Sequence, residues 1–116
     1  MPHTAPAPVL TVDVEHIAGV AVVHCHGRLV AGATSVLSTA VSELIPGNKR
    51  IILDLSDLKH TDSMGIGTLV RLYVSAKTSG CSLELIHLSQ QIRNLLGITN
   101  LLSLFTVIGE NGIKFM

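Results

Sequence analysis

The order and the period of the apolar residues predict an α/β fold with a mostly parallel central sheet. Apolar runs rich in β-branched residues alternate along the chain with stretches in which apolar residues recur at helical spacing. Strands that alternate with helices favour parallel pairing through right-handed crossovers. We therefore expect one domain in the order β-β-α-β-α-β-α-β, with an antiparallel hairpin at one edge and helices packed against the sheet.

The N-terminal part predicts a short lead-in followed by the hairpin. Residues 1–8, MPHTAPAP, are rich in Pro and Ala and are expected to be flexible, which leaves residues 9–116 for the domain. Polar and apolar residues alternate over residues 9–16, a pattern typical of a half-buried strand. A second β run follows at residues 20–27, and the short connection that contains Gly19 predicts the hairpin.

The middle of the chain predicts a helix and then a buried strand. Apolar residues in residues 36–45 fall on one helical face. Thr34 or Ser35 is expected to cap the start of this helix, and the Pro-Gly pair at 46–47 is expected to end it. The apolar, β-branched run at residues 50–56 predicts a buried strand.

Two more helices are expected in the second half. After a loop at residues 57–61, apolar residues in residues 66–76 again recur at helical spacing, and Gly80 provides the stop. Residues 81–88 predict a strand, and Ser89 is expected to cap a short helix over residues 90–97.

The C-terminal part predicts one last strand. Residues 101–109 form an apolar run that is expected to be part strand, and residues 110–116 are expected to form a tail.

The amino-acid composition narrows the range of functions to be considered. Apolar residues make up 47% of the 116 residues and charged residues only 14%, as in a globular domain. The formal net charge is zero, which gives no electrostatic basis for direct binding of nucleic acid or an anionic membrane. The 3% aromatic content also argues against stacking platforms for bases.

Apolar runs and cysteine positions predict the cellular compartment and the state of the two thiols. No secretory signal and no apolar run long enough to span a bilayer are seen, so we expect a cytoplasmic protein without membrane insertion. Cys25 and Cys81 each lie in an apolar run and are expected to be buried free thiols.

The most informative stretch is LDLSDLKHTDSMGIGTLVRLY, residues 53–73, in which an acid and a hydroxyl adjoin where a strand gives way to a helix. A nucleophile elbow at this junction would need a glycine where Thr61 stands, and no histidine follows in a late polar loop beside an orienting acid. A phosphate cradle is also poorly supported. Gly65 and Gly67 begin a G-x-G-x-x-G pattern, but Val70 occupies its last position. No cofactor is expected.

Metal binding at His24-Cys25-His26 was weighed as well. On a strand, the two histidines share one face and the cysteine points to the other. Two ligands on one face do not complete a zinc site, which favours hydrogen-bonded or exposed histidines and a core cysteine.

The residues at this junction agree best with a helix cap combined with a site that is switched by phosphorylation. Asp62 is well suited to accept hydrogen bonds from the first backbone N–H groups of the helix. Ser63 follows with Gly65 and Gly67 nearby, and Met64 is expected to point outward. A small, partly apolar helix start with one hydroxyl suits docking of a partner, which an added phosphate would disturb.

These residues resemble the signature of STAS domains of the bacterial anti-sigma factor antagonist (anti-anti-sigma factor) family. The resemblance rests on DLS at residues 54–56 and DSMGIGTL at residues 62–69. It extends to GRLVAG at residues 27–32 and to residues 80–105, and covers roughly residues 9–108.

The resemblance implies a regulatory binding module and no enzyme. Ser63 would be phosphorylated by an anti-sigma factor that is also a serine protein kinase, and a PP2C-type phosphatase would reset it. The unphosphorylated protein would sequester that kinase and release a sigma factor. The implied partner-binding residues are Asp54, Asp62, Ser63, Met64, Gly65 and Gly67. A homodimer is possible.

Two departures and several alternatives stay open. Met64 replaces a smaller, often hydroxylated residue of the family, which could alter kinase preference. His60-Thr61 replaces a more apolar pair, and His60 is expected to be exposed to solvent or, alternatively, to make a pH- or partner-sensitive contact. The same family also includes scaffolds of stress-signalling complexes and cytoplasmic subunits of lipid-transport ABC systems. A hydrolase that uses Ser63 is the enzymatic alternative, and nucleotide binding, proposed for some STAS domains, is a minor one.

Overall fold

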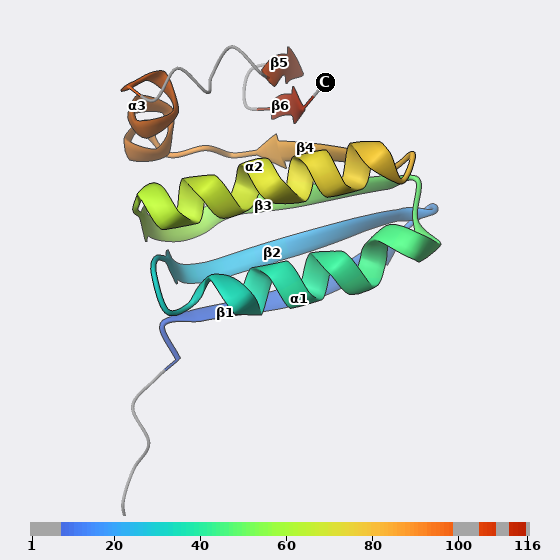
Figure 1. Cartoon of the computed structure of the whole chain (residues 1–116), viewed down its shortest axis with the longest axis horizontal. Coiled ribbons are helices and arrows are strands. Elements are labelled where there is room, and N and C mark those ends of the chain that lie inside the picture. Colours follow the sequence, from blue (N-terminus) through green and yellow to red (C-terminus); the bar gives the residue numbers. More distant parts are fainter. Residues whose placement is uncertain (1–7, 99–104, 109–111, 116) are drawn as a thin grey trace, which may run out of the picture.

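Six strands form one sheet in the computed structural model, which describes residues 8–98, 105–108 and 112–115. The strands are β1 (Leu10–Ile17), β2 (Val20–Leu29), β3 (Arg50–Thr61), β4 (Ser82–Ile86), β5 (Phe105–Ile108) and β6 (Gly112–Phe115). The helices are α1 (Thr34–Leu44), the 3₁₀ turn η1 (Ile45–Gly47), α2 (Ser63–Thr78) and α3 (Gln90–Ile98). Figure 1 shows α1 and α2 side by side along the same face of the sheet.

The strand order confirms the predicted fold class and adds a second antiparallel edge. The sheet runs β1-β2-β3-β4-β6-β5. The β1–β2 hairpin is antiparallel as expected, and β2, β3 and β4 pair in parallel. The expectation of a tail at residues 110–116 was wrong, because Gly112–Phe115 pairs as β6 between β4 and β5. Four residues are too few to show a period, so no strand could be predicted there.

The last predicted apolar run is described only in part. Residues 105–108 form β5, in agreement with a part-strand assignment. The remaining positions of that run, 101–104 and 109, lie outside the described residues.

Aliphatic side chains between the sheet and the two long helices form the core. Successive strand residues point to opposite faces, so every second residue over 21–25 of β2 and 51–55 of β3 is buried in the core. The helices contribute Leu37 and Val41 from α1, and Ile66 and Leu69 from α2. Full burial of each such side chain stabilises the fold by about 1.5–3 kcal/mol, which makes this layer the main source of stability.

Strand β3 is longer than the sequence indicated. The expected loop at residues 57–61 continues the strand as far as Thr61. The pairing with β2 advances from His24↔Asp54 to His26↔Asp57 and again from Gly27↔Leu58 to Arg28↔His60, so β3 carries two extra residues in bulges. The bulges interrupt the period of two, and this is why the polar residues after position 55 resembled a loop.

Helix ends agree with the local signals except at α1. Asp62 caps α2 and Ser89 caps α3, where the Ile92 N–H donates to Ser89 Oγ at 3.2 Å. The predicted cap of α1 by Thr34 or Ser35 was wrong: the N-cap position is Ala33, without a side-chain hydrogen bond. Both hydroxyl residues therefore lie within the first turn.

The cysteines are buried and unpaired, as predicted. Cys25 is 1% exposed and Cys81 is 4% exposed. Burial raises the pKa of the Cys25 thiol to about 12, so it stays protonated and unreactive at neutral pH. In the part of the chain that the structure describes, no helix has both the length and the apolar character needed to cross a bilayer.

Candidate functional site

The junction of β3 and α2 is fixed by the side chain of Asp62. Its backbone is extended, and one carboxylate oxygen accepts from the Gly65 N–H at 2.9 Å. The other oxygen accepts from the Ala31 N–H at 3.0 Å, which ties the start of α2 to the loop between β2 and α1. Hydrogen bonds from Ala31 and Gly65 lower the pKa of Asp62, so the cap remains charged at neutral pH.

The two glycines of the first turns of α2 face different environments. A Cβ atom on Gly65 would lie 2.2 Å from the carbonyl oxygen of Leu29 and 2.2 Å from Thr61 Oγ1, so only glycine fits. Thr61 is held there because its buried hydroxyl donates to that same carbonyl at 2.7 Å. A Cβ atom on Gly67 would meet no described atom within 4 Å. Gly65 is therefore packed closely against the end of β2 and β3, whereas Gly67 leaves a smooth outer surface.

Ser63 and Met64 lie on the surface of the first turn of α2. Met64 is 58% exposed, while Ile66 and Leu69 point into the core as predicted. Ser63 is exposed too. The hydroxyl is therefore accessible to a partner and is framed by one flexible apolar side chain.

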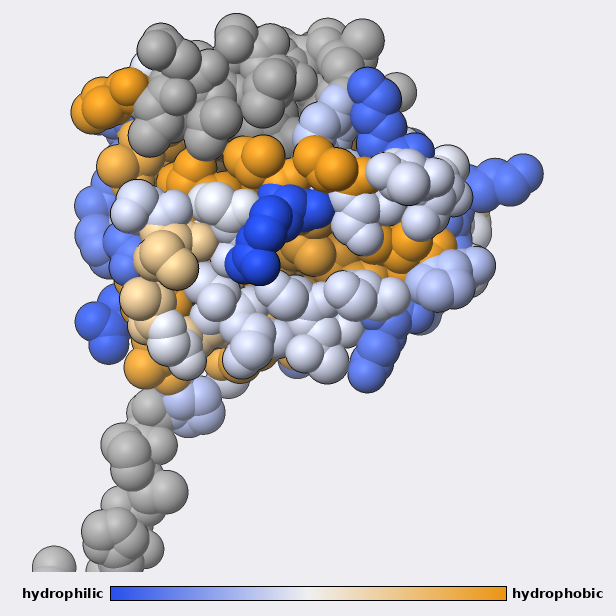
Figure 2. Space-filling view, in the orientation of Figure 1, coloured by the Kyte–Doolittle hydropathy of each residue, from blue (hydrophilic) through white to orange (hydrophobic). Residues whose placement is uncertain are grey.

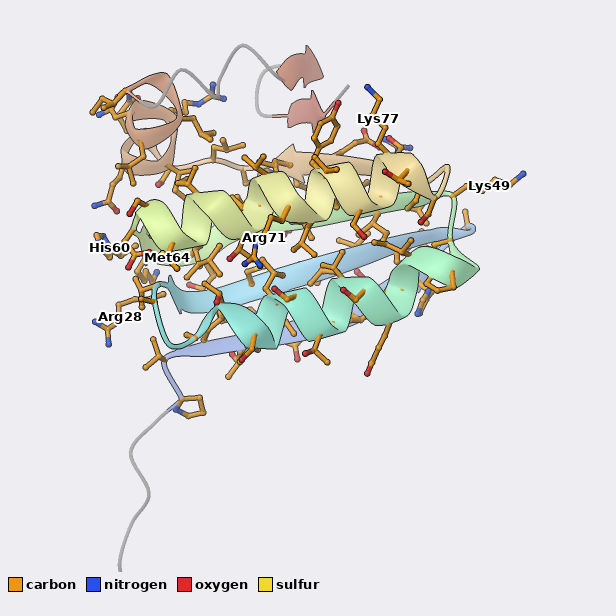
Figure 3. The ribbon with its side chains drawn as sticks, viewed as in Figure 1. Arg28, Lys49, His60, Met64, Arg71 and Lys77 are labelled. Carbon is orange, nitrogen blue, oxygen red and sulfur yellow. The ribbon has the colours of Figure 1, made fainter. Side chains whose placement is uncertain are left out.

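A hollow of about 610 Å³ adjoins Ser63. One wall comes from the end of β3 and the start of α2, and the other comes from α3. Its lining residues are His60, Thr61, Asp62, Ser63, Gln91, Asn94, Leu95 and Ile98. Figure 3 shows Arg28, His60 and Met64 at this same end of the molecule.

The face beside the hollow carries few charges. Figure 2 shows pale, weakly polar surface over much of the two long helices, with the strongly hydrophilic Arg71 near the centre and apolar surface between and beside the helices. Glu43 is the only charged residue in the sequence of α1, and α2 contains only Arg71 and Lys77. Such a surface is easily desolvated, which suits docking of another protein.

Asp54 does not lie beside Ser63. It falls within β3, between Leu53 and Leu55, whose side chains are in the core, so its carboxylate points to the face without helices. There it accepts hydrogen bonds from His24 Nδ1 at 2.9 Å and His87 Nδ1 at 2.9 Å. The structure thus joins Asp62, Ser63, Met64, Gly65 and Gly67 at one junction and separates Asp54 from them.

Two rows of hydrogen bonds cross the helix-free face, and we call them the histidine–carboxylate rows. In one row His24 bonds Glu15 at 3.2 Å and Asp54 at 2.9 Å. In the other, His26 bonds Asp13 at 2.9 Å and Asp57 at 2.7 Å. The prediction that the two histidines share a face and that Cys25 points away from them is confirmed. Within the described residues no group of three or more donors is arranged to hold a metal ion.

The rows shift the titration of their members. Hydrogen bonds to Glu15 and Asp54 raise the pKa of His24, and those to Asp57 and Asp13 raise the pKa of His26. Burial disfavours the charged form of Asp54, but hydrogen bonds from His87, Ser56 and His24 outweigh it and lower its pKa to about 2. Asp54 and Asp57, whose pKa values are both lowered, therefore stay charged at neutral pH, and His24 and His26 change their charge as the pH rises through their raised pKa values.

Sequence reasoning missed the acid partners of the histidines. Asp13 and Glu15 alternate on β1 and so were visible as one polar face. The sequence around Asp57 and His87 did not predict their contacts with histidine or acid partners. A bulge sets the position of Asp57, and a turn sets the position of His87.

Comparison with known proteins agrees with this geometry. The family model for the STAS domain matches residues 11–111, and the chain belongs to the STAS domain family. An anti-sigma factor antagonist from Mycobacterium paratuberculosis is similar in structure, with a TM-score of 0.77 and 19% identity over 92% of each chain.

Two further solved structures show the range of proteins that share this fold. The phosphorylated form of the Bacillus cell fate determinant SpoIIAA has a TM-score of 0.64 and 19% identity, over 78% of this chain and 85% of that one. The murine anion transporter Slc26a9 matches with a TM-score of 0.64 and 23% identity, over 72% of this chain but 14% of that one. At these identities the likeness concerns the fold alone.

Proposed function

We propose that this protein is a phosphorylation-controlled binding module with no catalysis of its own. Unphosphorylated, it binds an anti-sigma factor that is also a serine kinase and thereby releases a sigma factor. That kinase phosphorylates Ser63 and breaks the complex, and a PP2C-type phosphatase restores the binding form. The similar Mycobacterium paratuberculosis structure, which is named as an anti-sigma factor antagonist, supports this class of partner, and the similar Bacillus structure is of a phosphorylated form.

The observation that carries the proposal is the exposed hydroxyl of Ser63 beside a cap that is already in use. The Asp62 carboxylate accepts from the Gly65 N–H of the first turn and from the Ala31 N–H of the neighbouring loop. A phosphate on Ser63 would add about 1.5–2 negative charges next to that carboxylate. The Asp62 carboxylate already accepts from a backbone N–H of the first turn of α2. Much of the phosphate charge would therefore face the partner.

The surroundings of Ser63 explain why such a charge would release a partner. Met64 is exposed and Gly67 presents no side chain, so a partner can approach the turn closely. Close approach excludes water, and desolvating a doubly charged phosphate against an apolar contact is costly. Phosphorylation would therefore act by desolvation and repulsion, without refolding the domain.

The test is incubation with ATP and a serine kinase of the anti-sigma type, followed by mass spectrometry. We expect modification at Ser63, and Ser63→Ala should abolish it. Ser56→Ala is the matched control, because Ser56 is also an exposed serine but lies within β3. Modification at another residue, or equal labelling of Ser63→Ala, would contradict the proposal.

Binding gives the second measurement of the same proposal. The phosphorylated chain should bind the kinase at least about tenfold more weakly than the unmodified chain, as expected for one buried like-charge contact. Equal affinity of the two forms would exclude a switch at Ser63.

A further inference from the structure

Asp54 connects three separate segments on the helix-free face of the sheet. Its carboxylate accepts from His24 on β2 at 2.9 Å, from the Ser56 N–H on β3 at 3.0 Å and from His87 at 2.9 Å. The Asp54 side chain is only 12% exposed. A carboxylate that accepts this many hydrogen bonds is held in place, and it can in turn hold the residues that donate to it.

His87 is the neighbour whose backbone needs such support. It follows β4 directly, and its φ of +59° lies in the left-handed region that side chains other than glycine seldom adopt. Residues hold this conformation only when surrounding contacts impose it. The hydrogen bond from the His87 ring to Asp54 is a contact of that kind.

The position of His87 determines where α3 begins. Ser89 lies two residues later and caps the helix through the Ile92 N–H at 3.2 Å. Ile92 and Leu96 are 0% exposed and fix one stripe of α3 against the core. Just before the helix, Leu88 is partly buried against the core, and the hydrogen bond of His87 to Asp54 adds a polar constraint beside it.

The opposite side of α3 forms a wall of the hollow beside Ser63. Gln91, Asn94, Leu95 and Ile98 come from this helix, and they face His60 and Ser63 across the hollow. A shift at the start of α3 would therefore change the shape of the surface next to the serine.

We propose that Asp54 is a positioning residue for this site: through His87 it holds the start of α3, and with it the wall of the hollow beside Ser63. Asp54 acts without contact with Ser63, from the opposite face of the sheet. The structural claim stands by itself, and only its consequence for kinase binding rests on the proposed function.

The same carboxylate makes α3 sensitive to protonation of the nearest histidine row. His24 and His87 share Asp54, so loss of the His24 proton changes the charge that Asp54 and His87 experience. Among the residues whose side chains the structure describes, the other charged or titratable groups on this face are Asp13 and Glu15 of β1, His26 of β2, Arg50, Asp57 and Lys59 of β3, and Glu84 of β4. Arg50 pairs with Glu84 and Lys59 with Asp57, so the histidines that contact Asp54 are His24 and His87.

The test is a set of amide NMR spectra of the whole chain from about pH 5 to about pH 9, the range in which histidines titrate. In the wild type, the amide signals of α3 should shift with the same midpoint as the His24 ring. In Asp54→Asn this shared midpoint should disappear, and the α3 amides should exchange with solvent roughly 3- to 30-fold faster.

Asp57→Asn is the matched control, because it removes the acid of the neighbouring row and does not touch His87. It should leave the α3 amides as in the wild type. His87→Ala is the second variant, in case Asp54→Asn does not fold: alanine loses the ring contact but still carries a Cβ atom at the positive φ. It should reproduce the effect on α3. An unchanged α3 in Asp54→Asn or His87→Ala, or an equal effect of Asp57→Asn, would overturn the proposal.

Kinase affinity separates this proposal from the proposed function. Asp54→Asn should weaken binding roughly 3- to 30-fold, while Asp57→Asn should not. If the wild type does not bind the kinase at all, the proposed function fails while the spectra still decide the role of Asp54. If α3 shifts but affinity is unchanged, the wall of the hollow is not part of the docking surface.

Discussion

The two faces of β3 carry out different physical tasks with alternate residues of one strand. On the helix-covered face, Leu53 and Leu55 are 0% exposed and pack in the aliphatic core. On the helix-free face, Asp54 and Asp57 bind the histidines of the neighbouring strand. Burial of apolar area stabilises the helix-covered face at any pH, whereas the hydrogen bonds of the helix-free face depend on the protonation of the histidines.

The comparison also indicates how the site at the end of β3 is supported. The covered face brings Gly65 against Leu29 and so fixes α2 on the sheet. The open face attaches the turn before α3 to Asp54. The two walls of the hollow beside Ser63 are thus held from opposite faces of the same strand.

The largest effect is expected in the covered face. Leu55→Ala should lower the free energy of unfolding by about 2–5 kcal/mol, because it leaves a cavity in a fully buried layer. Ser56→Ala, one residue further on and exposed, should change it by less than about 0.5 kcal/mol. Urea denaturation monitored by circular dichroism measures both. Equal effects would mean that the two faces do not differ as described.

A smaller effect is expected where α2 meets the sheet. Gly65→Ala should cost about 1–3 kcal/mol, because the new methyl group would overlap backbone and side-chain atoms that cannot move freely. Gly67→Ala should instead stabilise the protein by up to about 1 kcal/mol, since it improves helix propensity in open space. Thermal melts of the two variants should move in opposite directions. A stable Gly65→Ala protein would show that the junction is looser than its distances indicate.

The smallest effect concerns pH and the open face. The pKa of His24 is raised in the folded state by Glu15 and Asp54, so the protonated form contributes stability that is fully present below about pH 6.5, its ordinary value. This contribution is lost as the pH rises through the raised pKa. His24 is 34% exposed, so solvent screening keeps the effect below about 1 kcal/mol.

His24→Gln should flatten the dependence of unfolding free energy on pH between about pH 6 and about pH 9, the range bracketed by the histidine pKa. His16→Gln changes a histidine of β1 outside both rows and serves as the control. If the wild type gains stability as the pH rises through this range, the rows do not act as described.

Local signals predicted most of the fold and the first turn of α2. Residues 36–45 and 66–76 showed helical spacing, and the cap by Asp62 needs only an acid at the residue before the helix. The part of the fold that was missed involves the second half of β3 and β6. A bulge disrupts the period of the former, and the latter spans only four residues.

The candidate site was predicted unevenly for the same reason. Ser63 and Met64 lie within one turn of their cap, so sequence distance was a good guide to their place in space. Asp54 was expected near Ser63 because the strand seemed to end close to Asp54. The strand instead continues to Thr61, and the Asp54 side chain lies on the opposite face of the sheet.

The sequence by itself determined most of the strands and helices, and it determined that Ser63 follows the cap of α2, because these features depend on residues a few positions apart. The tertiary structure alone decided which acid meets which histidine and that Asp54 holds the turn before α3. Those contacts depend on strand register and on one bulge, which join residues about thirty positions apart in the chain. A shift of one residue in that register would send every side chain to the other face.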